Sequence, residues 1–145
     1  MTFKAMGKST FVRYETVLEG KWALVVEDDA HSLVAISSLL RDLGIRFKRN
    51  TTGANVPQQI NEMEPLPDFV LMNLDLASGE AFTIQQGIRS TPALRSIPVI
   101  ALASDDDFKL REQVENAGFA ALVLKPLPRS QFGDLLERIL ADERV

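Results

Sequence analysis

Asp68-Phe69-Val70-Leu71-Met72-Asn73-Leu74-Asp75-Leu76 is a short apolar run followed directly by polar residues. The run Phe69–Met72 is continuous rather than alternating, which is typical of a strand that a parallel sheet buries on both faces. Asn73 stands at the point where such a strand emerges from the core. This stretch therefore predicts a central strand that presents Asn73 at its carboxyl end.

Three further apolar runs have the same character, namely Trp22–Val26, Pro98–Leu102 and Ala120–Leu124. Apolar residues at steps of three and four predict helices between and after the runs, over about residues 33–43, 110–117 and 132–139, with shorter helices over 56–63 and 82–90. Gly44 and Gly118 follow two of these helices, at positions where glycine suits a left-handed cap. Ser130 is expected to cap the last helix.

The stretch Arg46–Thr51 is basic and alternating, which predicts an edge strand with one face in solvent. The chain then consists of five strand–helix units, a pattern that predicts an α/β fold in which a doubly wound parallel sheet lies between two layers of helices. A polar second strand at the edge favours the flavodoxin-like order 2-1-3-4-5. Ligands of such sheets bind at the carboxyl ends of the strands, where the order switches between strands 1 and 3. Glu27, Asp28 and Asn73 are expected to converge there.

The composition fits one soluble globular domain. The 145 residues suit a single core, and 46% hydrophobic and 25% charged residues are ordinary proportions. The absence of cysteine excludes disulfides and thiol catalysis and fits a reducing compartment. No apolar stretch approaches the roughly 20 residues of a membrane span, and the first residues lack the apolar core of a signal peptide. We therefore expect a cytoplasmic protein without a membrane segment.

The charge distribution argues against binding to nucleic acid. The formal net charge is −4, and acidic and basic residues are mixed along the chain. A nucleic-acid interface normally needs a clustered basic face. The largest local group of cations is modest and consists of Arg41, Arg46, Lys48 and Arg49.

Residues 1–20 lie outside the five units and are expected to form an N-terminal extension to a main domain over 21–145. Phe11, Tyr14 and Leu18 in this extension are spaced three and four residues apart. That spacing predicts a short helix or docking arm, and a disordered tail is an equally open alternative, because chain termini are often loose.

Four motifs appear in an order that points to a known family: Ala23–Asp29, Pro67–Met72, Ile97–Leu102 and the pair Lys125-Pro126. They resemble the first strand with its acidic pair, the third strand, the fourth strand and the Lys-Pro signature of the response-regulator receiver domain of two-component signalling. The separations between the motifs also agree with that family's pattern. From about Lys21 onward, the resemblance implies a CheY-like fold.

The resemblance further implies a phosphoryl-accepting site. In the family, a central aspartate takes a phosphoryl group from a phosphohistidine, and this aspartate and the acid pair hold Mg²⁺, which prefers hard oxygen ligands. A hydroxyl on the fourth strand and the lysine then hold the phosphoryl oxygens. Glu27 and Asp28 match the acid pair, and Lys125 matches the lysine.

Three positions depart from the family pattern. Asn73 stands at the phosphoacceptor position, Ala103 replaces the usual serine or threonine, and Leu122 replaces the usual aromatic switch residue. An amide lacks both the charge and the nucleophilic oxygen of a carboxylate, so Mg²⁺ at Glu27, Asp28 and Asn73 is expected to bind weakly or not at all. We predict a degenerate receiver, or pseudo-receiver, which is not an enzyme and does not use ordinary aspartyl phosphorylation.

Simpler explanations exist for several of these residues. Glu27 and Asp28 could cap the helix that follows them. Lys125 could serve as the counter-charge that acids in low-dielectric surroundings require. Asn73 could accept a hydrogen bond from Lys125 and so hold one conformation.

Three other residues are polar or aromatic and lie near the strand ends or helix starts. Asp75, two residues after Asn73, is an alternative phosphoacceptor, although in the family this position mainly contributes a backbone carbonyl to the metal. His31 is the only histidine, cannot build a metal site alone, and is expected to be solvated at the start of a helix. Trp22 is expected to pack in the core or at its edge.

We therefore expect a stand-alone receiver-like domain that binds a protein partner, either a sensor kinase, another regulator, or a second copy in a homodimer. The surface that the family usually employs is formed by helix 4, strand 5 and helix 5, and here it would include Lys109, Arg111, Glu112, Leu122 and Arg129. Two alternatives stay open: a functional phosphorelay receiver that uses Asp75 as acceptor, and a flavodoxin-like binder of a small ligand. The lack of a phosphate loop and of any nucleophile–base pair speaks against the second.

Overall fold

A computed structural model describes residues 17–141 of the chain. The strands are β1 (Trp22–Val26), β2 (Arg46–Asn50), β3 (Phe69–Asn73), β4 (Val99–Ala103) and β5 (Ala121–Leu124). The helices are α1 (Ala30–Asp42), α2 (Val56–Glu62), α3 (Ala81–Ser90), α4 (Phe108–Asn116) and α5 (Arg129–Leu140). None of these helices has the length and apolar content needed to cross a membrane.

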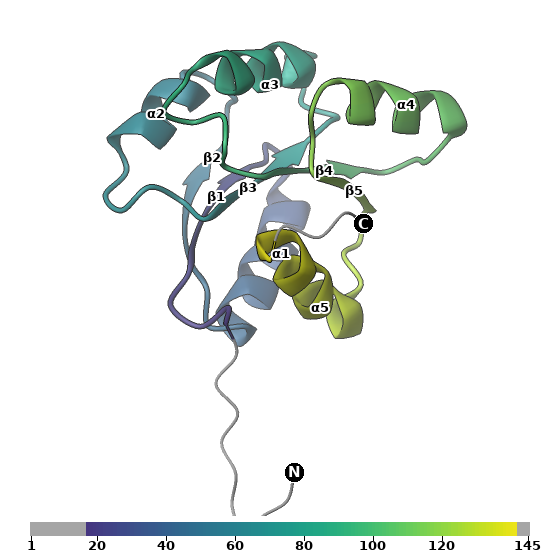
Figure 1. Ribbon diagram of the computed structural model, residues 1–145. Helices are drawn as coiled ribbons and strands as arrows, with labels where there is room; N and C mark the ends of the chain where they lie inside the picture. The colour runs from purple at the N-terminus through teal and green to yellow at the C-terminus, as the bar shows by residue number, and fades with distance from the viewer. Residues whose placement is uncertain (1–16, 142–145) are drawn as a thin grey trace, which may run out of the picture.

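The five strands form one parallel sheet in the order β2-β1-β3-β4-β5. Helices α1 and α5 cover one face of the sheet, and α2, α3 and α4 cover the other (Figure 1). The predicted flavodoxin-like, three-layer α/β/α fold is confirmed. This order places β1 beside β3, so the carboxyl ends of these two strands meet at the switch point of the sheet.

Each face of the sheet has its own hydrophobic core, because successive residues of a strand point to opposite faces. In β3, Val70 and Met72 belong to the core beneath α2, α3 and α4. Phe69 and Leu71 belong to the core beneath α1 and α5. The continuous apolar run therefore supplies two cores at once, which is why it shows no polar alternation.

Strand β2 pairs only with β1 and forms an edge of the sheet. Its basic residues are exposed, whereas Phe47 is half-buried against the core beneath α1 and α5. The guanidinium group of Arg41 lies 5.4 Å from the centre of the Phe47 ring, and that of Arg46 lies 5.9 Å from the centre of the Trp22 ring. Half of the basic group noted in the sequence is thus engaged with aromatic rings, and Trp22 packs at the edge of the core as predicted.

The helix ends follow the expected glycine positions but not the expected serine. Gly44 and Gly118 have φ of 76° and 83°, so both are left-handed as predicted. Helix α5 begins at Arg129, and Pro128 is its N-cap residue without a side-chain hydrogen bond. The prediction that Ser130 caps α5 was wrong, because the fixed φ of Pro128 already starts the turn before that serine.

The turn of residues 17–20, just before β1, is part of the packed domain. Leu18 is completely buried in the core beneath α1 and α5. The Gly20 N–H donates to the Gly44 carbonyl at 2.8 Å, which fixes this turn against the end of α1. Packing therefore begins before Lys21. Phe11 and Tyr14, on which the idea of a docking arm also depended, lie outside the described residues.

Candidate functional site

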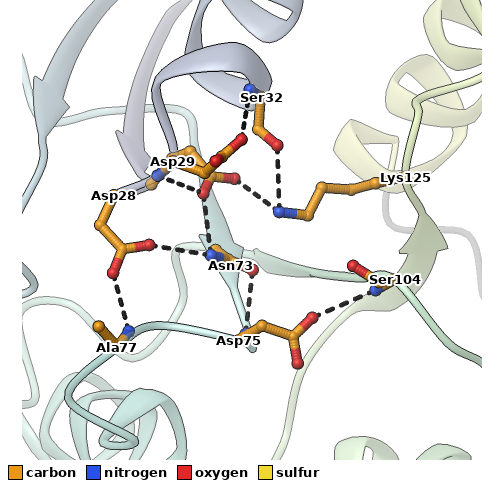
Figure 2. Close-up of polar contacts among 9 residues, drawn as sticks. Asp28, Asp29, Ser32, Asn73, Asp75, Ala77, Ser104 and Lys125 are labelled. Atoms are coloured by element: carbon orange, nitrogen blue, oxygen red, sulfur yellow. Dashed lines mark hydrogen bonds and ion pairs between the residues drawn. The ribbon is translucent and has the colours of Figure 1, made fainter.

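The carboxyl ends of three strands bring Glu27, Asn73 and Lys125 into one pocket (Figure 2). Glu27 follows β1, Asn73 ends β3, and Lys125 follows β5. The Glu27 side chain is fully buried and Asn73 is 2% exposed, whereas the neighbouring Asp28 is exposed. The structure thus brings together Glu27, Asp28 and Asn73, which were predicted to converge, and adds Lys125 to them.

The carboxamide of Asn73 bridges the acidic pair. Its Nδ2 donates to Glu27 Oε2 at 2.9 Å and to Asp28 Oδ1 at 3.2 Å, and its Oδ1 accepts from the Asp75 N–H at 2.9 Å. The reversed orientation would place the amide oxygen against two carboxylates and the NH₂ group against an N–H donor. The surroundings therefore specify one orientation, in which both amide hydrogens are committed to the acids.

Lys125 provides the counter-charge for Glu27. Its Nζ donates to Glu27 Oε1 at 3.0 Å and to Ser32 Oγ at 3.4 Å. The predicted neutralising role of the lysine matches this ion pair. The predicted hydrogen bond between Lys125 and Asn73 was wrong, because the Glu27 carboxylate accepts from both side chains, one on each oxygen.

Asp29, rather than Glu27 or Asp28, caps the helix that follows β1. Its carboxylate accepts from the Ser32 N–H at 2.8 Å, and this backbone hydrogen bond is the main cause that lowers the pKa of Asp29. Asp28 Oδ2 instead accepts from the Ala77 N–H at 2.8 Å and ties the loop before α3 to the end of β1. The capping explanation for Glu27 and Asp28 was wrong. Aspartate is a favoured N-cap residue type, but three consecutive acids concealed which one has this role.

The Asp29 cap predicts a pH dependence at the start of α1. A lowered pKa means that the folded state favours the carboxylate, so the stabilisation is complete above the ordinary value of 3.8 and is lost as the pH falls through the lowered value. We expect the Ser32 amide to lose protection from hydrogen exchange only in that acidic window. In Asp29→Asn, which keeps a capping oxygen, the protection should not change there. An Asp29 carboxyl that titrates at or above 3.8 in an NMR experiment would contradict the assignment.

The position where the family has a hydroxyl offers no polar group here. Ala103 ends β4 and is 2% exposed. The next residue, Ser104, is exposed, and it is its backbone N–H that donates to Asp75 Oδ2 at 3.2 Å. Figure 2 shows the Asp75 carboxylate directed toward Ser104 and away from Lys125. Asp75 thus lies outside the network around Asn73 except through its backbone N–H.

Two other predicted positions are found where they were expected. Leu122 on β5 is half-buried and packs against the core beneath α2, α3 and α4. Its side chain has no polar group that could change partners. His31 is exposed in the first turn of α1, as predicted.

The donor set does not fit the Mg²⁺ ion that the family resemblance implies. All four carboxylate oxygens of Glu27 and Asp28 already accept hydrogen bonds from protein donors. Asn73 directs nitrogen, not oxygen, toward these acids, and Mg²⁺ requires oxygen ligands. Within residues 17–141, no group of three or more His, Cys, Asp and Glu side chains is arranged to hold a metal. A cation here would have to reverse the carboxamide and break its bond with the Asp75 N–H.

This arrangement can hold strand ends and loops together, and at the family's phosphoacceptor position it presents a carboxamide. The nitrogen of a carboxamide is not a nucleophile, and here it is a donor to two carboxylates. The network joins β1, β3, β5 and the first turn of α1 through contacts of 2.8 to 3.4 Å. Its chemical character is that of a closed structural cluster.

Comparison with known proteins agrees with this architecture. The family model of the response regulator receiver domain matches residues 23–139. The two-component response regulator-like APRR9 of Arabidopsis thaliana is 26% identical over 116 residues, which are 80% of this chain and 25% of that protein. The chain therefore spans about a quarter of the length of this plant relative.

A bacterial regulator and a solved receiver domain match over most of their own length. The polar-differentiation response regulator DivK of Brucella abortus is 24% identical over 122 residues, which are 84% of this chain and 98% of DivK. The crystal structure of the receiver domain of sensor histidine kinase PA1611 from Pseudomonas aeruginosa, with a magnesium ion in its active-site cleft, is 26% identical. It covers 84% of this chain and 98% of its own, with a TM-score of 0.75. The chain belongs to the response regulator receiver domain family.

Proposed function

We propose that this chain is a receiver-like module of two-component signalling that acts by binding a protein partner and does not undergo ordinary aspartyl phosphorylation. One observation carries the proposal: the residue at the phosphoacceptor position is Asn73, and both of its amide hydrogens are bound to Glu27 and Asp28. An acyl phosphate requires a carboxylate oxygen that attacks phosphorus. The carboxamide supplies none, and its nitrogen occupies the side of the acid pair where a cation would be needed.

The rest of the pocket supports a single, fixed state. Ala103 has no hydroxyl group that could donate a hydrogen bond to a phosphoryl oxygen. Leu122 has no polar group that could change hydrogen-bond partners. Lys125 is already engaged by Glu27. Because every polar group of the acid pair has a partner without phosphorylation, the module has no internal driving force to switch by the usual route, and signalling would depend on which partner is present.

The surface formed by α4, β5 and α5 is the proposed place of contact, in the cytoplasm. Lys109, Arg111 and Glu112 are exposed on α4, and Arg129 is exposed at the start of α5, where it pairs with Asp42. The names of the relatives, which include a response regulator and a receiver domain of a sensor kinase, suggest a kinase, another regulator or a second copy as partner. Binding without chemistry means that the chain is not an enzyme.

Treatment with acetyl phosphate and Mg²⁺ tests the proposal. We expect mass spectrometry to find no acyl phosphate on the wild type, including Asp75, whose carboxylate faces Ser104 rather than Lys125. The double variant Asn73→Asp/Ala103→Thr, which restores the carboxylate and the hydroxyl, should become labelled. Asp75→Asn in that background serves as the matched control and should leave the labelling unchanged. A labile phosphoryl group on the unaltered chain would overturn the proposal and favour Asp75 as an unusual acceptor.

A further inference from the structure

A large groove lies at the end of the sheet opposite the Asn73 pocket. Its volume is about 1140 Å³. Helix α4, the start of β5 and the end of α5 line it, and it continues beyond this face to the loop before β4 and to the residue before β1. The groove therefore extends the proposed contact surface around the amino-terminal ends of the strands.

The charge of the groove is opposite to that of the whole chain. Four cations line it, Lys21, Arg89, Arg95 and Arg111, against the two acids Asp68 and Glu115, although the chain has a net charge of −4. Arg111 pairs with Asp106 outside the groove. Within residues 17–141, none of the other three cations forms an ion pair. Three cations without an ion-pair partner thus line the groove against two acids, which leaves it with a net positive charge.

Arg89 has a buried nitrogen without a hydrogen-bond partner in the described part of the chain. Its guanidinium group donates through one nitrogen to the carbonyls of Leu94 and Ile97, and its buried Nε–H has no acceptor among the described residues. Burial lowers the pKa of Arg89, with no acid nearby to oppose the effect. Gly118 passes close to its stem, since a Cβ there would lie 3.3 Å from Arg89 Cδ. The backbone therefore holds this cation at the groove, where a carboxylate from outside would compensate its charge.

Apolar side chains line part of the groove. Val114, Phe119, Leu122 and Ile139 contribute to it. A groove lined by both apolar and cationic side chains matches a ligand that carries apolar side chains and carboxylates together. Nucleic acid would satisfy the cations but not the apolar lining.

We propose that this groove binds a partner protein through a segment in which acidic and apolar residues alternate. The inference rests on the proposed function and adds the chemistry of the partner to it. The carboxylates would meet Lys21, Arg89 and Arg95, and the apolar side chains would cover Phe119 and Leu122. Binding of this kind needs neither phosphorylation nor a metal.

Fluorescence anisotropy with two short synthetic peptides tests the inference. One peptide alternates leucine and glutamate, and the other has lysine in place of every glutamate. We expect the full chain to bind the glutamate peptide at least tenfold more tightly and to lose affinity as salt is added. Arg95→Glu, an exposed position that leaves the core intact, should weaken binding about fivefold to tenfold. Lys48→Glu on the opposite edge strand makes the same charge change and should leave the affinity unaltered.

Three results would overturn the inference: equal affinity for both peptides, equal losses in Arg95→Glu and Lys48→Glu, or tighter binding of a single-stranded RNA oligonucleotide than of the glutamate peptide. Arg89→Met provides a second measure, since it removes a cation while keeping most of the stem, and it should also reduce the preference for glutamate. The titration is independent of the labelling experiment. Phosphorylation of the wild type would contradict the proposed function without affecting the peptide result. Equal binding of the two peptides would contradict only the inference about the groove.

Discussion

Asn73→Asp should make the stability of the domain depend on Mg²⁺, whereas the wild type should be indifferent to the ion. The substitution removes two hydrogen bonds to carboxylates and puts a third carboxylate where the NH₂ group now lies. Hydrogen bonds to charged groups contribute about 1.5 to 3 kcal/mol each, and like charges at this distance repel. In the absence of divalent cations, we expect the free energy of unfolding to fall by about 3 kcal/mol or more.

Mg²⁺ should reverse much of this loss in the variant, because three carboxylates at the strand ends then form an oxygen donor set. An ion present at about 100 times its dissociation constant stabilises the folded state by about 2.7 kcal/mol. Urea unfolding in EDTA and in increasing MgCl₂, with NaCl holding the ionic strength constant, measures the effect. Asn73→Ala is the matched control, since it removes the same hydrogen bonds without adding charge and should be destabilised at every Mg²⁺ concentration. If Mg²⁺ raised the free energy of unfolding of the wild type and of Asn73→Asp equally, the carboxamide would not exclude the cation.

The fold could be predicted from the sequence because burial of a parallel strand leaves a local signature. Phe69–Met72 shows no polar residue, since both faces of β3 are covered, whereas β2 alternates because it lies at the edge. The same logic placed Asn73, which must be the first polar residue as the strand leaves the core. The positive φ of Gly44 and Gly118 could also be predicted from the sequence, because few other residue types adopt that backbone conformation.

The contacts inside the pocket could not be predicted in the same way. The sequence places Lys125 and Asn73 at the carboxyl ends of their strands. Whether the two side chains form a hydrogen bond depends on the position of Glu27 between them. The capping role of Asp29 was missed because periodicity detects only the apolar residues of a helix, and Asp29 and the first two residues of α1 are exposed. The groove cations were missed for a related reason: Lys21 is far in sequence from Arg89 and Arg95, and only the packing of loops at the strand starts brings it beside them.

Lys125→Met should produce one of the largest losses of stability available to a single substitution outside the apolar cores. The Glu27 side chain has no exposed surface, and Lys125 is its only cationic partner among the described residues. Removal of one member of a buried ion pair leaves an uncompensated charge and costs about 3 to 5 kcal/mol. The free energy of unfolding of a domain is typically about 5 to 15 kcal/mol, so chemical denaturation should detect this loss easily. Lys109→Met, on an exposed lysine, should change the free energy of unfolding by no more than about 0.5 kcal/mol.

The double variant Glu27→Gln/Lys125→Met separates the charge from the shape of the pocket. A neutral amide at position 27 can still accept from Asn73 Nδ2 and from the Asp29 N–H, which now donate to Glu27 Oε2. Because a buried pair replaced as a whole is often close to neutral, we expect the double variant to recover most of the stability lost in Lys125→Met. The losses of stability in the single variants Glu27→Gln and Lys125→Met should therefore be strongly non-additive, as they are for groups in direct contact. Additive losses would mean that Lys125 stabilises the fold through contacts other than Glu27, and the closed network around Asn73 would then not be the unit that holds the strand ends together.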